Sequence, residues 1–434
     1  SLVDFKKIFG LGILEHGYRT PSAIFYLNSL FYLPGIKFYL LNSGAIFIFG
    51  FSNIFLINKT FSRFHNKNYD SIFFLSILAF IYINTAFYRI AEHGTDRSSL
   101  ILIFIFAIIY LESISFKNKQ YDHDLKNYYE KMIIIITLII SFKSFYLIYG
   151  LFIFIWMYEQ KNFSSIKQLI NIIFKNNFTY LCFFSIFAVI FTTFSNTGCL
   201  VYPLSFTCFE NFSWSLPTSQ VEQMKSWYEL WSKSGADPNN RVSNPELYIQ
   251  GLNWLSHWVN NYFFTKVSDF LFVLFLISFI CIFYLRPSKR KTIKKNKIDF
   301  KLFYFMIIFF TLEWFYNHPA LRYGGYTLIA LLVFIPISIY LSKFTYDSNK
   351  LKKKIIILFL LSLSIYMVKN YNRILFESEK YNFKPLTNPY FHINSDGFKF
   401  GYYLKSIQNK FYPNNTYKFI IINKEIINKL KNKN

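Results

Sequence analysis

The sequence predicts an all-α membrane protein with about ten transmembrane helices, for three reasons. Of its 434 residues, 53% are hydrophobic and 22% are aromatic, whereas only 16% are charged. The apolar residues lie in near-continuous blocks, such as 133–140 and 355–363. The aromatic content excludes a disordered or collagen-like chain, and four cysteines are too few for a disulfide scaffold.

A helix that crosses the hydrocarbon core, which is roughly 30 Å thick, needs about 20 mostly apolar residues. The block 131–158 allows either one long span or two short helices that turn at 141–144. A lysine at mid-membrane depth is costly, so Lys143 favours a break that faces protein or water. Residues 21–33 predict a half-helix that dips from the membrane surface. The other expected spans are 38–58, 71–88, 98–115, 178–195, 265–285, 302–315, 324–341 and 355–368.

The distribution of Lys and Arg decides between these two alternatives. With two helices in 131–158, the inner loops hold 22 Lys and Arg and the outer loops hold 6, as the positive-inside rule requires. The polytopic domain then covers 1–368 and has a large outer loop at 195–264. We expect residues 369–434 to form a small α/β appendage outside the membrane, on the outer side.

The net charge of +24 is thereby explained largely by membrane orientation and by contact with anionic lipid. The aromatic residues lie in apolar blocks and the cations lie in loops, so we expect no nucleic-acid partner. The chain begins at Ser1 with no signal peptide, and we expect it to be a fragment of a protein with 11 or more spans.

Unusual polar clusters collect on the predicted outer side. One contains Glu92, His93, Asp96 and Arg97, and these residues fit either a solvated turn or a site. Paired acids at a membrane surface suit a divalent metal or the activation of a hydroxyl group. Asp96 and Glu92 with a nearby histidine would suit Mg²⁺ or Mn²⁺ better than zinc.

A second cluster lies between the two spans at 302–315 and 324–341. Arg322 there either extends its charge toward the membrane surface or holds the phosphate of an anionic lipid. His318 is either an interfacial polar residue or a site residue. A further cluster, before the half-helix, contains His16 and Arg19.

The outer loop at 195–264 holds five of the seven tryptophans, and two pairs among them are spaced i,i+4. This spacing fits an amphipathic helix on the membrane or, as the alternative, a platform that stacks on sugars. Cys199 and Cys208 in the same loop predict a disulfide, because the loop is expected outside the cytoplasm. Cys182 and Cys281 lie within spans and predict buried thiols.

The segment His318-Pro319-Ala-Leu-Arg322-Tyr323-Gly-Gly resembles the Arg-Tyr signature that opens a late span in GT-C superfamily membrane glycosyltransferases. Asp96-Arg97 resembles their second acidic motif. The segment from Glu15 through His16 and Arg19 resembles the end of their first outer loop. The resemblance covers about residues 1–340 and is closest to an uncharacterised bacterial family of polytopic membrane proteins near that superfamily. The acid expected in the first outer loop is absent or lies before Ser1.

This resemblance implies a glycosyltransferase of the bacterial inner membrane, with the outer loops and the tail in the periplasm. It would transfer a sugar from a polyprenyl-phosphate donor to a glycan or lipid acceptor in the cell envelope. Catalysis is expected from Asp96, Glu92 and His93. Substrate binding is expected from Arg322, Tyr323, Arg97, His318, His16 and Arg19.

Two alternatives remain. One is a transporter or flippase of lipid-linked or anionic solutes, in which Lys143 and the break at 141–144 line the pathway. The other is a non-catalytic protein of envelope assembly.

Overall fold

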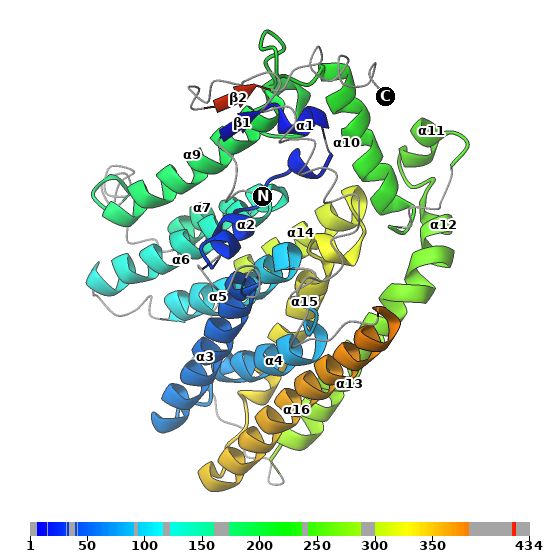
Figure 1. Ribbon diagram of the computed structural model, residues 1–434. Coiled ribbons are helices and arrows are strands. Elements are labelled where there is room, and N and C mark those ends of the chain that lie inside the picture. The colour runs from blue at the N-terminus through cyan, green and yellow to red at the C-terminus, as the bar shows by residue number, and fades with distance from the viewer. Residues whose placement is uncertain are drawn as a thin grey trace. The chain divides into compact units, whose positions relative to one another are not determined.

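The computed structural model is predominantly helical (Figure 1). It describes residues 7–14, 16–31, 33, 40, 42–90, 94–115, 122–159, 173–236, 242–287, 300–381 and 419–421. The chain divides into two units. The first comprises Ser1–Ala45, Phe184–Ser226 and Asn372–Asn434, and the second comprises Ile46–Phe183 and Trp227–Tyr371.

The first unit contains short elements and the ends of longer helices. Its strands β1 (Lys7–Phe9) and β2 (Phe419–Ile421) pair in parallel, with Lys7 opposite Phe419. Between them in the chain lie α1 (Leu11–Leu14), η1 (His16–Tyr18), α2 (Ala23–Ser29) and η4 (Ser205–Thr207), together with parts of α9 (Asn177–Thr197) and α10 (Thr218–Lys233). The predicted half-helix at 21–33 is therefore the seven-residue helix α2.

The second unit is built around α4 (Ser71–Ala86) and α5 (Gly94–Ser115). Every residue of α4 from Ser71 to Thr85 is buried, as expected for a helix that is apolar on all sides and enclosed by others. The other elements of this unit include α3 (Ser43–His65), α6 (Asp122–Phe142), η3 (Ser144–Gly150), α7 (Leu151–Glu159), α11 (Pro245–Ile249), α12 (Leu255–Trp258), the π-helix η5 (Val259–Val267), α13 (Ser268–Leu285), α14 (Lys301–Asn317), η6 (Leu321–Tyr323), α15 (Gly325–Leu341) and α16 (Ser348–Tyr381).

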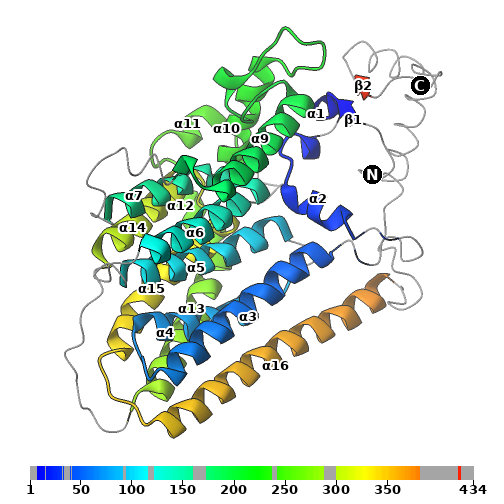
Figure 2. The same cartoon turned by 90° about the vertical axis from the view of Figure 1, so that its left-hand side faces the viewer.

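Two packing contacts in this unit determine where the beginnings of α5 and α15 lie. Helices α5 and α6 lie side by side (Figure 2). Helix α15 packs on both α4 and α5, since Tyr82 donates to the Tyr326 carbonyl at 2.8 Å and Thr327 donates to the Leu100 carbonyl at 3.0 Å. The beginning of α15 is therefore fixed beside the beginning of α5.

Four helical segments among the described residues are long and apolar enough to cross a membrane: Ser43–His65, Thr95–Ser115, Asn177–Thr197 and Leu255–Leu285. This is fewer than the ten spans expected from the sequence. The apolar helical segments Ser71–Ala86, Ser144–Glu159 and Gly325–Leu341 are too short by the same measure, because a crossing helix needs about 20 residues. The structure thus supports a helical protein with candidate membrane spans and does not support the larger number.

The expected α/β appendage at 369–434 is likewise not supported. Helix α16 continues through residue 369 as far as Tyr381, and the only other part of the tail that the structure describes is β2.

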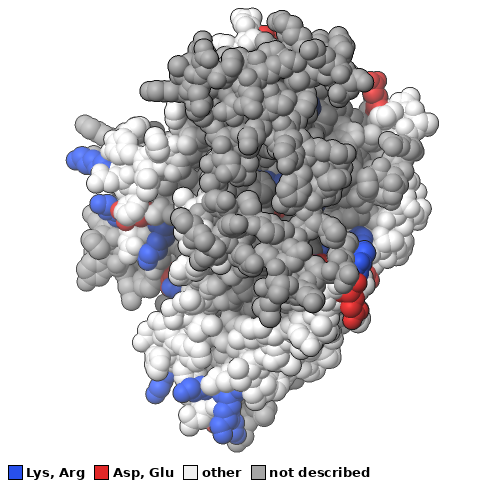
Figure 3. All heavy atoms as spheres, viewed as in Figure 1, with Lys and Arg blue, Asp and Glu red and all other residues white. Residues whose placement is uncertain are grey.

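The space-filling view (Figure 3) shows where positively charged side chains cluster on one face of the molecule. Lys and Arg gather where α16 begins, next to a broad surface that is almost free of charge (Figure 3).

The break predicted within 131–158 is confirmed. Helix α6 ends at Phe142, Lys143 has an extended backbone with φ −153° and ψ 110°, and η3 begins at Ser144. The Lys143 side chain faces protein, as the cost of a membrane-buried charge requires.

Candidate functional site

Arg322 lies in a short loop between α14 and α15, residues 318–324, which we call the Arg322 loop. Ala320 and Leu321 in this loop are fully buried, so their backbone polar groups need partners within the protein. Side chains from three other elements and from α14 supply these partners. Ser232 Oγ accepts from Ala320 N at 3.1 Å, Tyr262 OH accepts from Leu321 N at 3.0 Å, Trp314 Nε1 donates to Ala320 O at 2.9 Å, and Trp258 Nε1 donates to Pro319 O at 3.3 Å.

Glycine is needed at each of the two positions after Tyr323, for a different structural reason. Gly324 has φ +127°, a conformation that side-chain-bearing residues rarely adopt. A Cβ atom on Gly325 would lie 2.3 Å from the Trp314 ring. The Gly-Gly pair therefore lets the chain turn into α15 while Trp314 packs directly against its first residue.

The Arg322 guanidinium is bound to Asp96 in the first turn of α5. Arg322 Nε and Nη2 contact Asp96 Oδ2 at 2.8 and 2.7 Å. The other carboxylate oxygen, Oδ1, accepts from Lys143 Nζ, which reaches it from the break between α6 and η3. Three segments far apart in the sequence thus converge on one carboxylate.

This group of three, which we call the Asp96 triad, has an uneven exposure to its surroundings. The Asp96 side chain is 5% exposed, that of Lys143 is 19% exposed and that of Arg322 is 46% exposed. Two cations and one anion leave one positive charge over. Burial lowers the pKa of Arg322, whereas the Asp96 carboxylate and the Tyr323 and Tyr262 hydroxyl groups raise it, and together they leave the pKa above its ordinary value. The triad therefore presents a fixed cation at its accessible edge.

Aromatic rings surround the two cations. Lys143 Nζ lies 4.5 Å from the centre of the Tyr323 ring, and Arg322 lies 5.7 Å from that of Trp231. Such contacts stabilise a cation without neutralising its charge. The Tyr323 ring also contacts Phe145 and His318, at 5.6 and 5.8 Å between centroids.

His318 is neutral in this setting. Burial lowers the pKa of His318 to about 4; the Glu229 carboxylate opposes the shift, and the Lys233 and Lys143 ammonium groups add to it. The ring can therefore accept or donate a hydrogen bond at neutral pH without adding charge to the site.

The structure brings together four of the residues predicted from the sequence: Asp96, Arg322, Tyr323 and His318. Arg97 is placed elsewhere, with its guanidinium between the rings of Phe87 and Tyr326, at 4.9 and 4.7 Å. Its Nη1 atom is buried and has no hydrogen-bond partner among the described residues. Among the described contacts, Arg97 therefore does not join Arg322, with which it was expected to bind substrate.

The remaining predicted residues are His16, Arg19, Glu92 and His93. His16 and Arg19 belong to the first unit, where Arg19 is buried and its Nε donates to the Gly12 carbonyl at 2.8 Å. Glu92 and His93 lie outside the described residues.

The residues around Asp96 do not fit the expected Mg²⁺ or Mn²⁺ ion. Both carboxylate oxygens accept from cationic groups, and a second positive charge beside them disfavours a divalent cation. No group of three His, Cys, Asp or Glu residues that could hold a metal occurs in the part of the chain that the structure describes. Glu92, the other tentative ligand, lies outside that part.

Sequence reasoning did not assign Lys143, Ser232, Trp231 and Tyr262 to a site with Arg322. The pairing of Lys143 could have been predicted, because a lysine inside an apolar block needs a negatively charged partner. An acid at the start of another span can be that partner. The two hydroxyl groups that accept from the Arg322 loop, on Ser232 and Tyr262, could not be recognised in the same way.

The disulfide predicted between Cys199 and Cys208 is present. It closes the turn directly after α9, and the two cysteines also form an isolated antiparallel bridge. Cys182 and Cys281 are free and buried, as predicted.

The protein has a helical fold with candidate membrane spans and a positively charged triad around a buried carboxylate. Residues 2–329 match a family that is described as a domain of unknown function, DUF8201, and the chain belongs to this family. The matched region contains all three residues of the Asp96 triad. No curated protein and no solved structure matches the chain.

Proposed function

We propose that the protein is a membrane glycosyltransferase that transfers a sugar from a polyprenyl-phosphate donor to a glycan or lipid acceptor of the cell envelope. The observation that carries this proposal is the Arg322 guanidinium, which is half exposed and is held in place by a buried carboxylate. A planar, permanently charged fork of this kind suits a phosphate group. A phosphate is the leaving group of the proposed donor.

In the proposed reaction, an acceptor hydroxyl oxygen forms a bond to the anomeric carbon of the sugar. The bond from that carbon to the phosphate oxygen breaks, and its electron pair stays on the phosphate. Arg322 stabilises the charge that develops there, with Lys143 adding to the positive potential. Because the triad is pre-formed by Asp96, these groups need little reorganisation during the reaction.

The role of Asp96 in this proposal is to position two cations. Its oxygens are already engaged, so it is poorly placed to take the proton of the acceptor hydroxyl. Glu92 and His93, close to Asp96 in the sequence, are the candidates to accept this proton. His318, with its pKa of about 4, is a weak base and suits a hydrogen-bonding role better.

We further propose that the shorter apolar helices of the second unit also cross the membrane and that the triad faces the periplasm. A second ion-pair network supports this arrangement, since Glu112 accepts from Lys59 and from Arg63 near the other end of α5. Asp96 and Glu112 are separated by about 24 Å along the helix axis, nearly the thickness of the hydrocarbon core. The two networks would then lie near the two membrane surfaces of a bacterial inner membrane.

A transfer assay in proteoliposomes with a polyprenyl-phosphate-linked sugar tests the enzyme proposal. We expect Arg322→Ala and Asp96→Asn each to abolish transfer when equal amounts of folded protein are compared, since Asp96→Asn also removes one partner of a buried ion pair. Arg286→Ala serves as the control, because Arg286 lies at the far end of α13, against Phe344. Undiminished transfer by both site variants would contradict the site assignment.

One observation favours a transporter or flippase as the second candidate. Lys143 lies at a helix break and pairs with an acid inside the helical unit, a combination that also occurs on transport pathways. Movement of a labelled lipid-linked sugar across the bilayer, without a covalent product, would favour this candidate over the enzyme.

A further inference from the structure

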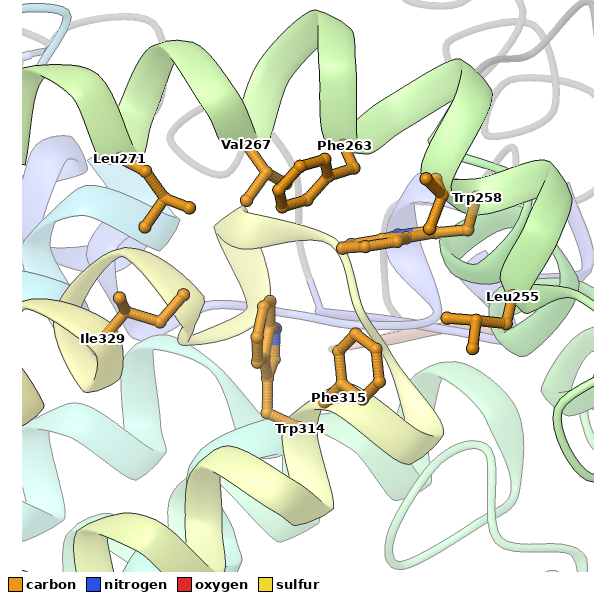
Figure 4. A pocket seen from close by; sticks show the side chains of 9 residues that line it. Leu255, Trp258, Phe263, Val267, Leu271, Trp314, Phe315 and Ile329 are labelled. Atoms are coloured by element: carbon orange, nitrogen blue, oxygen red, sulfur yellow. The ribbon is translucent and has the colours of Figure 1, made fainter.

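The second unit contains a cavity of about 350 Å³ whose lining is entirely apolar. Figure 4 shows the side chains around it, with Trp258, Phe263 and Leu271 on one side and Trp314 and Ile329 on the other. Three elements thus contribute: the helix that runs from α12 through η5 to α13, the end of α14 and the start of α15. A cavity of this size lies in the range of ligand pockets, and its lining offers a ligand no charge.

The position of this cavity indicates what fills it. Its longest wall belongs to the candidate membrane span Leu255–Leu285, which continues from α12 through the π-helix into α13. On that helix, the residues next to the lining residues point outward: Phe264 is 64% exposed and Phe272 is 67% exposed. Because this helix is a candidate membrane span, the exposed phenylalanines next to the lining residues would face hydrocarbon, so a lipid chain would have access to the cavity.

We propose that this cavity binds one acyl chain of a bilayer phospholipid. The driving force is the removal of chain methylene groups from less well packed surroundings into contact with Trp258, Trp314 and Phe263. The π-helix η5 contributes to the cavity, since its wider turn displaces the side chains of this helix from regular spacing. Single π turns within helices are frequent at functional sites.

The same two tryptophans connect the cavity to the Arg322 loop. Trp258 and Trp314 are 4% and 3% exposed, and their indole nitrogens donate to the carbonyls of Pro319 and Ala320. Each ring therefore has one face or edge on the cavity and its polar end on the loop. An acyl chain that fixes these rings also fixes the backbone directly before Arg322. The chain is a ligand of the fold, and its binding does not require that the protein transfers sugars.

Photolabelling tests this proposal. The detergent-solubilised protein is titrated with a phosphatidylglycerol that carries a diazirine in one acyl chain, irradiated and mapped by peptide mass spectrometry. We expect saturable labelling of peptides that contain Leu271 and Ile329. Two variants, Leu271→Trp and Ile329→Phe, fill the cavity from opposite sides. If one of them fails to fold, the other still tests the proposal. Each should abolish the saturable part of the labelling, because the added ring occupies the volume in which the chain would lie.

The control is Phe275→Trp, which adds bulk on the exposed face of the same helix. Labelling that rises linearly with dose and is equal in all four proteins would show ordinary contact with surrounding lipid and would overturn the proposal. Displacement of the label by a polyprenyl phosphate, but not by unlabelled phosphatidylglycerol, would assign the cavity to a prenyl chain and overturn the proposed occupant.

Two further measurements separate this proposal from the proposed function. Arg322→Ala should leave the labelling unchanged even if it abolishes sugar transfer. Backbone hydrogen exchange across residues 318–324 should slow when phosphatidylglycerol is added to the protein, and this slowing should disappear in Leu271→Trp. If the protein is saturably labelled but the exchange rate of residues 318–324 does not change when lipid is added, the proposed connection between the cavity and the loop is wrong.

Discussion

Asp96 and Arg322 are 226 residues apart in the sequence, yet Arg322 Nε donates to Asp96 Oδ2 at 2.8 Å. The contact joins the first turn of α5 to the loop before α15. Because Lys143 occupies the other oxygen, one carboxylate holds two cations from different parts of the chain. The stability of this part of the protein and the geometry of its candidate site therefore depend on the same side chain.

Replacement of Asp96 with asparagine should destabilise the protein by about 3 kcal/mol, because removing one partner of a buried ion pair leaves an uncompensated charge. Thermal unfolding in detergent measures this change. Asp269→Asn, at an exposed position in the first turn of α13, should have little effect. Combining Asp96→Asn with Lys143→Met should restore part of the loss. A double variant no more stable than Asp96→Asn would show that the Lys143 charge is not the cause.

The substitution Gly325→Ala should destabilise the protein by about 1–3 kcal/mol, since its Cβ would overlap the Trp314 ring and overpacking costs this much. Gly50→Ala in α3 is the matched control. A Cβ at Gly50 meets no atom within 4 Å, so this change should be neutral or stabilise the helix by up to about 1 kcal/mol. Denaturation midpoints of the two variants compare these effects, and equal midpoints would argue against the packing described for Trp314.

The pKa of His318, lowered to about 4 by burial, predicts a pH-dependent contribution to stability. An unfolded histidine has a pKa of about 6.5, so between these values only the unfolded state binds the proton. The contribution is complete above about pH 6.5 and is lost as the pH falls toward 4. His318→Gln should therefore lose less stability than the native protein between pH 7 and pH 4.5. Parallel melting curves for both proteins over this range would contradict the neutral, buried ring.

Loss of the disulfide should lower stability by about 2–3 kcal/mol, the loop-closure contribution expected for a loop of this length. The variant is Cys199→Ser, compared with Cys281→Ala, which removes a buried free thiol instead. The comparison uses unfolding under oxidising and reducing conditions. Reduction should destabilise the native protein and Cys281→Ala but leave Cys199→Ser unchanged; equal sensitivity in all three would exclude the bond as the cause.

The sequence was sufficient to identify much of the candidate site but not its assembly. Arg322, Tyr323 and His318 lie in one short motif, and Asp96 is an acid at the start of an apolar block, so residue type and position singled them out. Their convergence depends on the packing of α15 against α4 and α5, which no local pattern specifies.

The placement of Arg97 could not be predicted from its position next to Asp96. Successive residues on a helix point about 100° apart, so Asp96 and Arg97 in the first turn of α5 cannot face the same group. Treating adjacent charges as one cluster ignored this geometry. The expectation of about ten spans came from apolar blocks alone, whereas four helical segments among the described residues are long and apolar enough by themselves to cross a membrane.

The disulfide between Cys199 and Cys208 has a consequence for experiments on orientation. Such bonds persist in oxidising compartments and are rare in the reducing cytosol. The loop after α9 is thus a built-in reporter of the compartment in which it matured. A thiol-trapping assay on whole cells would then read out which side of the membrane this loop occupies, without a fused tag or an engineered cysteine.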